Sequence, residues 1–235
     1  MNLEPNGESS NLTQEQYRLV QTPTFKKWFG NWETEPQVYY HGSYDYGWKV
    51  VDVHGSSEQC LFWMSTSKTM AEGFTGARRF GYKNEQEYFE REGRIGGVYS
   101  FFVKTNKIFD VFNYNQVEEV NRELVNLIDK EYVHTYVGGL SGYNGKYNRF
   151  KSKDYYKNPK GEDWIGGWTS YDWNIVEGWE SDMWIIGMLK QLGYDCITNK
   201  EGGVLNIGFI GNPEQIKLAD GTNTTFDSNN PNISK

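Results

Sequence analysis

Three consecutive residues, His41, Gly42 and Ser43, could together bind a planar polar ligand. They follow residues 38–40, an apolar Val-Tyr-Tyr run typical of a strand, so we expect them at a strand end. A glycine there lets a flat ligand approach the backbone, where one extended residue exposes an N–H and a C=O. A carboxamide needs one donor and one acceptor, and the imidazole can hydrogen-bond a hydroxyl. The same tripeptide is also common in plain turns.

A second candidate segment combines aromatic and hydroxyl side chains. An apolar run over 59–64, which includes Trp63, predicts a strand. It leads into Ser65-Thr66-Ser67, whose hydroxyls suit the N-cap of a helix that carries Phe74 on its apolar side. We interpret Ser65 first as a helix cap and second as a ligand to the catalytic acid or to a bound ribose. The chain holds 9 Trp and 17 Tyr, and such aromatic faces fill cores and also stack on flat ligands.

Both segments resemble motifs of a known enzyme family. Residues 39–43 resemble the first NAD-binding motif of the ADP-ribosyltransferases, in the branch of diphtheria toxin and the poly(ADP-ribose) polymerases. Residues 61–74 resemble the second motif of that family. The chain as a whole is similar to the ADP-ribosyltransferase domain of polyvalent phage and mobile-element proteins, which is framed by segments like 12–33 and 212–233. Five such segments follow in order, whereas residues 113–180 have no counterpart.

The resemblance implies both a fold and a substrate. The implied fold is α+β, an ADP-ribosyltransferase-like split β-sandwich of two small, mainly antiparallel sheets with flanking helices and an NAD cleft between them. NAD⁺ is implied as a substrate that is cleaved, without a metal, and not as a hydride carrier. Its nicotinamide ring would lie between two aromatic side chains, a favourable place for a cationic ring. The residues implied in binding NAD are His41, Gly42, Ser43, Trp63, Ser65 and Phe74.

The catalytic acid is where the sequence departs from the family pattern. Family members usually carry a glutamate in the strand before an Asn-Pro-x-Gln-Ile segment, where its charge stabilises the ribosyl cation. The corresponding place here holds Ile207 or Gly208. The nearest polar residue is Asn206, and the nearest acid upstream is Glu201, in a predicted Glu-Gly-Gly turn. Strand alternation puts Asn206 and Gly208 on one face and Ile207 on the other.

Several residues could take the place of the missing catalytic glutamate. Glu201 could reach the site from the turn, and it is the acid that we favour. Asn206 could serve with reduced power, or Glu177 or Glu180 could enter from the region without a counterpart. His41 completes the set of candidate catalytic residues. If no acid is present, the domain binds without turnover.

Three functions follow from these alternatives. We expect a mono-ADP-ribosyltransferase that releases nicotinamide and transfers ADP-ribose to a protein acceptor. With water as the acceptor, the same site would make the chain an NAD glycohydrolase. A catalytically silent domain that docks another protein through its aromatic surface and a long loop over 138–168 is the third alternative.

Composition narrows the partners. The net charge of −7 disfavours nucleic acid, and no run approaches the roughly 18 apolar residues that span a membrane. The two cysteines, Cys60 and Cys196, lie in apolar runs and predict neither a disulfide nor a metal site. No apolar stretch near the start predicts a signal peptide, which leaves the compartment open. We expect a monomer.

The order of patterns along the chain predicts its organisation. Residues 1–36 form a helical arm with a helix start at Asn11 or Thr13 and a break at Thr22-Pro23. Residues 37–222 form the ADP-ribosyltransferase-like domain, in which 113–180 is an inserted helix and loop. The last residues, 223–235, are predicted as a polar tail. Further strands are predicted over 97–103, 107–111, 194–198 and 204–210, and further helices over 115–133 and 182–192.

Overall fold

The computed structural model describes most of the chain outside one long central segment. The described residues are 3–30, 32, 36–53, 61–110, 113, 115–116, 119–120, 189–201 and 203–235. Several sequence predictions therefore lie outside them: Cys60, the loop over 138–168, Glu177, Glu180, and most of the helices predicted over 115–133 and 182–192.

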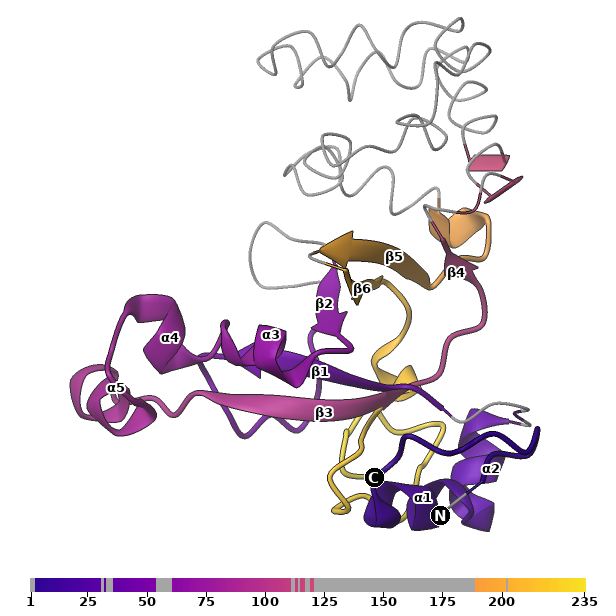
Figure 1. Cartoon of the computed structure of the whole chain (residues 1–235), viewed down its shortest axis with the longest axis horizontal. Helices are drawn as coiled ribbons and strands as arrows, with labels where there is room; N and C mark the ends of the chain where they lie inside the picture. The colour runs from indigo at the N-terminus through magenta and orange to yellow at the C-terminus, as the bar shows by residue number, and fades with distance from the viewer. Residues whose placement is uncertain are drawn as a thin grey trace, which may run out of the picture.

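Within the described residues, seven strands form one sheet in the order β4-β5-β6-β2-β1-β3-β7. Neighbouring strands are antiparallel except for β4 and β5, which are parallel. With short helices beside this sheet, the predicted α+β class is confirmed (Figure 1). The strands are β1 Val38–Ser43, β2 Phe62–Ser65, β3 Gly97–Val103, β4 Ile108–Phe109, β5 Cys196–Glu201, β6 Val204–Phe209 and β7 Ile216–Leu218.

The prediction of two separate sheets is wrong, because the described strands form a single sheet with a narrow junction. Strand β1 makes six register pairs with β3, and β2 makes four with β6. Between β1 and β2 only one pair forms, Tyr40 with Ser65. Figure 1 shows β2 rising steeply from β1, and strands that diverge in this way cannot keep a longer ladder. We call the region beyond this pair, toward Gly42 and Trp63, the split.

Short helices with clear caps follow β2. Helix α3, Lys68–Glu72, begins at the N-cap Ser67, whose hydroxyl accepts a hydrogen bond from the Met70 N–H at 3.2 Å. Ser65 lies two residues earlier, so the prediction of Ser65 as the cap is wrong by two positions. Helices α4, Gly76–Phe80, and α5, Glu85–Glu92, form a lobe at one end of the sheet, seen at the left of Figure 1.

The N-terminal arm has the predicted break between two helices. Helix α1, Gln14–Val20, starts at Thr13 with a full capping box, and α2, Pro23–Phe29, starts at Thr22 with the proline in its first turn. The arm packs against the sheet through a cluster that includes residues of α2, β1 and β3. Its buried members are Val20, Phe25, Trp28, Val38, Phe102, Ala219 and Phe226.

The C-terminal residues pack on the domain, where the sequence predicts a polar tail. Phe226 and Ile233 are buried, and the Asn223 amide donates to the Ile233 carbonyl at 3.0 Å. The Lys217 ammonium, itself buried, donates to the carbonyls of Asn230 and Asn232. Two apolar anchors and a buried cation thus hold a segment that looks polar in composition.

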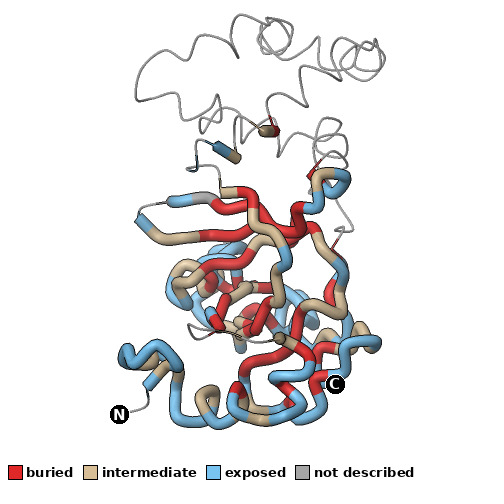
Figure 2. Tube along the Cα trace, turned by 90° about the vertical axis from the view of Figure 1, so that its right-hand side faces the viewer, coloured by how far each residue is buried: buried red, intermediate tan, exposed pale blue. Residues whose placement is uncertain are grey.

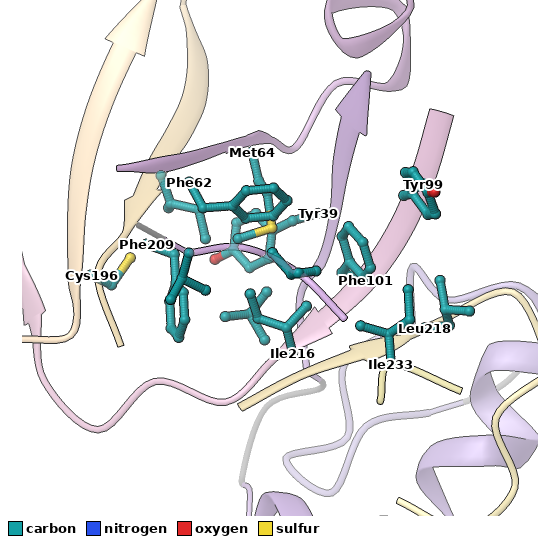
Figure 3. Packing of buried hydrophobic residues seen from close by; sticks show 14 residues of the cluster. Tyr39, Phe62, Met64, Tyr99, Phe101, Cys196, Phe209, Ile216, Leu218 and Ile233 are labelled. Atoms are coloured by element: carbon teal, nitrogen blue, oxygen red, sulfur yellow. The ribbon is translucent and has the colours of Figure 1, made fainter. Parts of the chain in front are cut away.

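The two faces of the sheet differ in what they bury. The face that we call the core face carries alternate apolar residues of the long strands, and Figure 3 shows them packed together. In Figure 2, buried residues, in red, run along the strands. The opposite face, the α3 face, is partly covered by α3. Residues of the core face include Tyr39, Phe62, Met64, Phe101, Ile207, Phe209 and Ile216.

Candidate functional site

The split exposes the backbone edge of Gly42. The Ala219 N–H donates to the Ser100 carbonyl at 2.9 Å, so the polar backbone groups of Ser100 point away from β1. Directly opposed antiparallel residues point their groups both toward or both away from each other. Tyr40, opposite Ser100, therefore directs its N–H and C=O toward β2, and so does Gly42 two residues later. Register pairing with β2 ends at Tyr40, which leaves the Gly42 groups facing the split.

Residues 41–43 lie at the end of a strand, as predicted, but they belong to it, since β1 extends three residues beyond the predicted run over 38–40 and ends at Ser43. Pairing with β3 holds this end of β1 straight, with Ser43 opposite Gly97. Pairing with β3 along one edge fixes β1, so the other edge is presented at Gly42 by a rigid strand, as a binding site requires.

His41 lies on the core face with its ring in an aromatic setting. The imidazole stacks on Phe62 with ring centroids 4.4 Å apart, and Trp48 lies at 5.4 Å. Its Nδ1 lies 2.7 Å from the Trp63 carbonyl oxygen, across the split. Since a carbonyl only accepts, Nδ1 carries the hydrogen and Nε2 holds the lone pair.

Burial lowers the pKa of His41, and the hydrogen bond to Trp63 only partly opposes that shift. The imidazole is therefore neutral near pH 7, with Nδ1 fixed as donor to the Trp63 carbonyl. A neutral ring in this tautomer leaves Nε2 as an acceptor, on the face of the sheet opposite to the Trp63 side chain.

Helix α3 and the turn after it lie directly over Gly42. A Cβ added to this glycine would lie 1.8 Å from the Ala71 carbonyl oxygen and 3.1 Å from the Phe74 Cβ. Only glycine allows so close an approach of helix and strand. Phe74 is thus held beside the Gly42 edge, and half of its surface stays exposed.

Trp63 lies on the α3 face of β2, opposite Gly208 of β6. A Cβ at Gly208 would lie 3.3 Å from the indole atoms Cη2 and Cζ3, so the glycine gives the indole room over β6. Trp63 therefore leans toward β6, whereas Phe74 lies on the β1 side at Gly42. The two predicted clamp residues come from opposite sides of the split, and the structure places both on its α3 face.

Ser43 and Ser65 have local roles in the structure. The Ser43 hydroxyl donates to the Asp45 carbonyl and accepts from the Asp45 N–H, which closes a turn on the core-face side. The Ser65 hydroxyl accepts from the Ser67 N–H at 3.0 Å and so supports the entry to α3. Ser65 belongs to the α3 face with Trp63, whereas Ser43 is not brought to that group.

A row of polar residues crosses the α3 face at the narrow junction. The register pairs place Asn199, Asn206, Ser65, Tyr40 and Ser100 side by side on five neighbouring strands. Asn206 and Ser65 are both buried. The buried Asn206 Oδ1 has no hydrogen-bond partner among the described residues, a costly arrangement for a polar atom.

The register also ranks the two candidates for the catalytic charge. Asn206 pairs with Ser65, one register step from the Trp63–Gly208 pair that borders the split. Glu201 pairs with Val204, two steps away on the same face, and each step of two residues spans about 7 Å. Glu201 is also the last residue of β5 and not part of the turn. By register, Asn206 therefore lies nearer the split than Glu201.

Some features of this site have a signal in the sequence and others do not. Gly208, inside a strand, marks a close approach that the Trp63 indole fills. The stacking of Phe62 and Trp48 on His41 depends on which strands pair, and no local pattern encodes it.

Comparisons with known proteins found no match for this chain. No family model matches the sequence, and neither a curated protein nor a solved structure matches the chain. In the part of the chain that the structure describes, no helix has the length and apolar character to cross a membrane. The same residues contain no group of three or more metal-ligating side chains.

Proposed function

We propose that this chain binds NAD⁺ at the split between β1 and β2 and transfers its ADP-ribose to an acceptor. The observation that carries the proposal is the Gly42 edge, whose N–H and C=O face the split beyond the last β1–β2 pair. A nicotinamide carboxamide has the matching acceptor and donor. Phe74 beside Gly42 and Trp63 across the split would take the two faces of the ring.

The neighbouring polar groups fit the rest of the nucleotide. His41 lies on the core face, and its proposed part is to hold the Trp63 backbone through the bond from Nδ1 to the Trp63 carbonyl. The buried Asn206 amide and the Ser65 hydroxyl lie one register step from Trp63, where the ribose joined to nicotinamide would come. The bond between nicotinamide and ribose would therefore lie between the aromatic pair Trp63 and Phe74 on one side and the polar row on the other.

The proposed reaction breaks one bond and forms one. The C–N bond between ribose and nicotinamide breaks, and its electron pair leaves with neutral nicotinamide, which leaves a ribosyl cation. A nucleophilic atom of an acceptor, proposed to be a protein side chain, then bonds to the anomeric carbon and loses its proton to water. Stacking against Trp63 and Phe74 favours the cationic ring of NAD⁺ and aligns the bond that breaks.

Labelled NAD⁺ tests the proposal directly. The protein is incubated with NAD⁺ alone and with a cell lysate, while free nicotinamide and labelled macromolecules are measured. Nicotinamide release with labelled protein supports transfer, and release without label assigns water as the acceptor. If NAD⁺ neither binds in calorimetry nor releases nicotinamide, the proposed function is wrong.

A matched pair of phenylalanines locates the site. Phe74 and Phe89 are similarly exposed, at 50% and 45% of their surface, but Phe89 lies on α5, away from Gly42. We expect Phe74→Ala to weaken NAD⁺ binding about tenfold, while Phe89→Ala leaves it unchanged. Equal affinities of the two variants would place the ligand elsewhere.

A further inference from the structure

Asn206 has a buried side-chain oxygen that no described residue contacts through a hydrogen bond. This atom is Oδ1, and the residue is 8% exposed. A buried acceptor without a hydrogen bond destabilises the fold. Native proteins therefore rarely retain such an atom unless it has a role. The register places it beside Ser65 and one step from the Trp63–Gly208 pair at the split. An orphaned acceptor at this position points to a ligand with a hydrogen-bond donor.

The surrounding register positions bring no carboxylate to Asn206. Its own row holds only neutral residues, namely Asn199, Ser65, Tyr40 and Ser100. The next row toward the split holds Ile197, Gly208 and Trp63, with Gly42 on β1. These two rows of the described sheet therefore offer no carboxylate to the proposed ribose, and Asn206 offers an uncharged amide oxygen.

We infer that Asn206 binds NAD⁺ through its amide oxygen and, because that oxygen is uncharged, keeps cleavage slow relative to binding. The inference rests on the proposed function and adds that the site is built to hold the dinucleotide more than to turn it over. A neutral amide accepts a hydrogen bond from a ribose hydroxyl as a carboxylate does. It gives the ribosyl cation far less electrostatic stabilisation, because a fixed negative charge in a dry site is a large catalytic factor.

Two substitutions at Asn206 separate binding from chemistry. Asn206→Leu removes the acceptor and keeps a similar volume, so it should raise the melting temperature of the free protein while weakening NAD⁺ binding about tenfold. Asn206→Asp keeps the acceptor and adds a charge, so it should raise the rate of nicotinamide release about a hundredfold. The gained activity should be lost at low pH, because burial raises the pKa of a carboxyl group and protonation removes its charge.

Two further variants are needed. One tests whether an added charge anywhere on the protein has the same effect, and the other tests Glu201 as the alternative catalytic acid. Asn229→Asp adds the same charge at an exposed position outside the site, and it should change neither affinity nor rate. Glu201→Gln tests the rival acid, because loss of the wild-type release in this variant would assign the catalytic charge to Glu201.

The experiment measures melting temperature, NAD⁺ affinity by calorimetry and nicotinamide release for wild type and these four variants. Tight binding with slow release in wild type, and the expected changes in both Asn206 variants, support the inference. Unchanged affinity of Asn206→Leu, or no gain in Asn206→Asp that still binds NAD⁺, overturns it while the proposed function stands. Loss of the slow wild-type release in Glu201→Gln also overturns it. Failure of the wild type to bind NAD⁺ instead removes the proposed function.

Discussion

The two faces of the same sheet are built for different purposes. On the core face, strand alternation brings apolar residues such as Phe101 and Phe209 together, and both are fully buried. On the α3 face, the same alternation brings together Gly42, Trp63 and a polar row that includes Asn206. The core face is satisfied by its own contacts, whereas the α3 face holds the Gly42 edge beyond the last β1–β2 pair and an amide oxygen without a partner among the described residues. The difference indicates that stability and ligand binding depend on separate residues.

Phe209→Ala should give the largest change in stability, because it removes a fully buried ring from the core face. We expect the free energy of unfolding to fall by about 3–5 kcal/mol. Urea denaturation followed by tryptophan fluorescence measures it. A loss below about 1 kcal/mol would mean that this face is not the main source of stability.

Gly42→Ala should affect both stability and ligand binding, since its Cβ would clash with the Ala71 carbonyl oxygen of α3. We expect a cost of about 1–3 kcal/mol as α3 is pushed from the strand, together with loss of NAD⁺ binding as Phe74 moves. Denaturation and calorimetry measure the two effects. Gly81→Ala, at the end of α4, is a suitable control because its positive φ makes it destabilising while it lies away from the split. Equal effects of both variants on NAD⁺ affinity would contradict the proposed role of Gly42.

Trp63→Ala should act mainly on the ligand, because the indole is only half-buried and lies on the α3 face. We expect about tenfold weaker NAD⁺ binding, caused by the loss of stacking on the cationic ring. Calorimetry at a temperature where both proteins are folded measures the change. An affinity equal to that of wild type would remove Trp63 from the site.

The His41 imidazole should give the smallest effect, a dependence of stability on pH. Its pKa in the folded chain is lowered by burial, so the unfolded chain takes up the proton first as the pH falls. The contribution of neutral His41 is therefore complete above about pH 6.5 and is lost as the pH falls below that value. Urea midpoints of wild type and His41→Gln measured from about pH 8 to about pH 5 should converge at low pH. A constant difference across that range would show that His41 keeps an ordinary pKa.

Local patterns predicted the elements whose causes are local. The pattern in Gly97–Val103 gives β3, Thr13 begins the first helix of the arm as expected, and the expected break falls at Thr22-Pro23, where the second helix begins. Phe226 and Ile233 stand alone in a polar segment, so neither shows a period that would predict their burial.

The geometry of the site depends on strand pairing, which local patterns do not encode. The single Tyr40–Ser65 pair creates the split, and it follows from how β1 and β2 are each held by another strand. The same register places Asn206 nearer to the split than Glu201, although both are polar residues of one hairpin. The sequence alone identifies both residues as candidates, but only the strand pairing shows which of them lies nearer the split.

A crystal structure of the protein with nicotinamide or NAD⁺ tests the central claim most directly. The account predicts the carboxamide oxygen within hydrogen-bond distance of the Gly42 N–H and the carboxamide nitrogen at the Gly42 carbonyl, with the ring between Trp63 and Phe74. A ligand bound elsewhere, with the Gly42 edge still facing β2 and empty at saturating ligand, would contradict it.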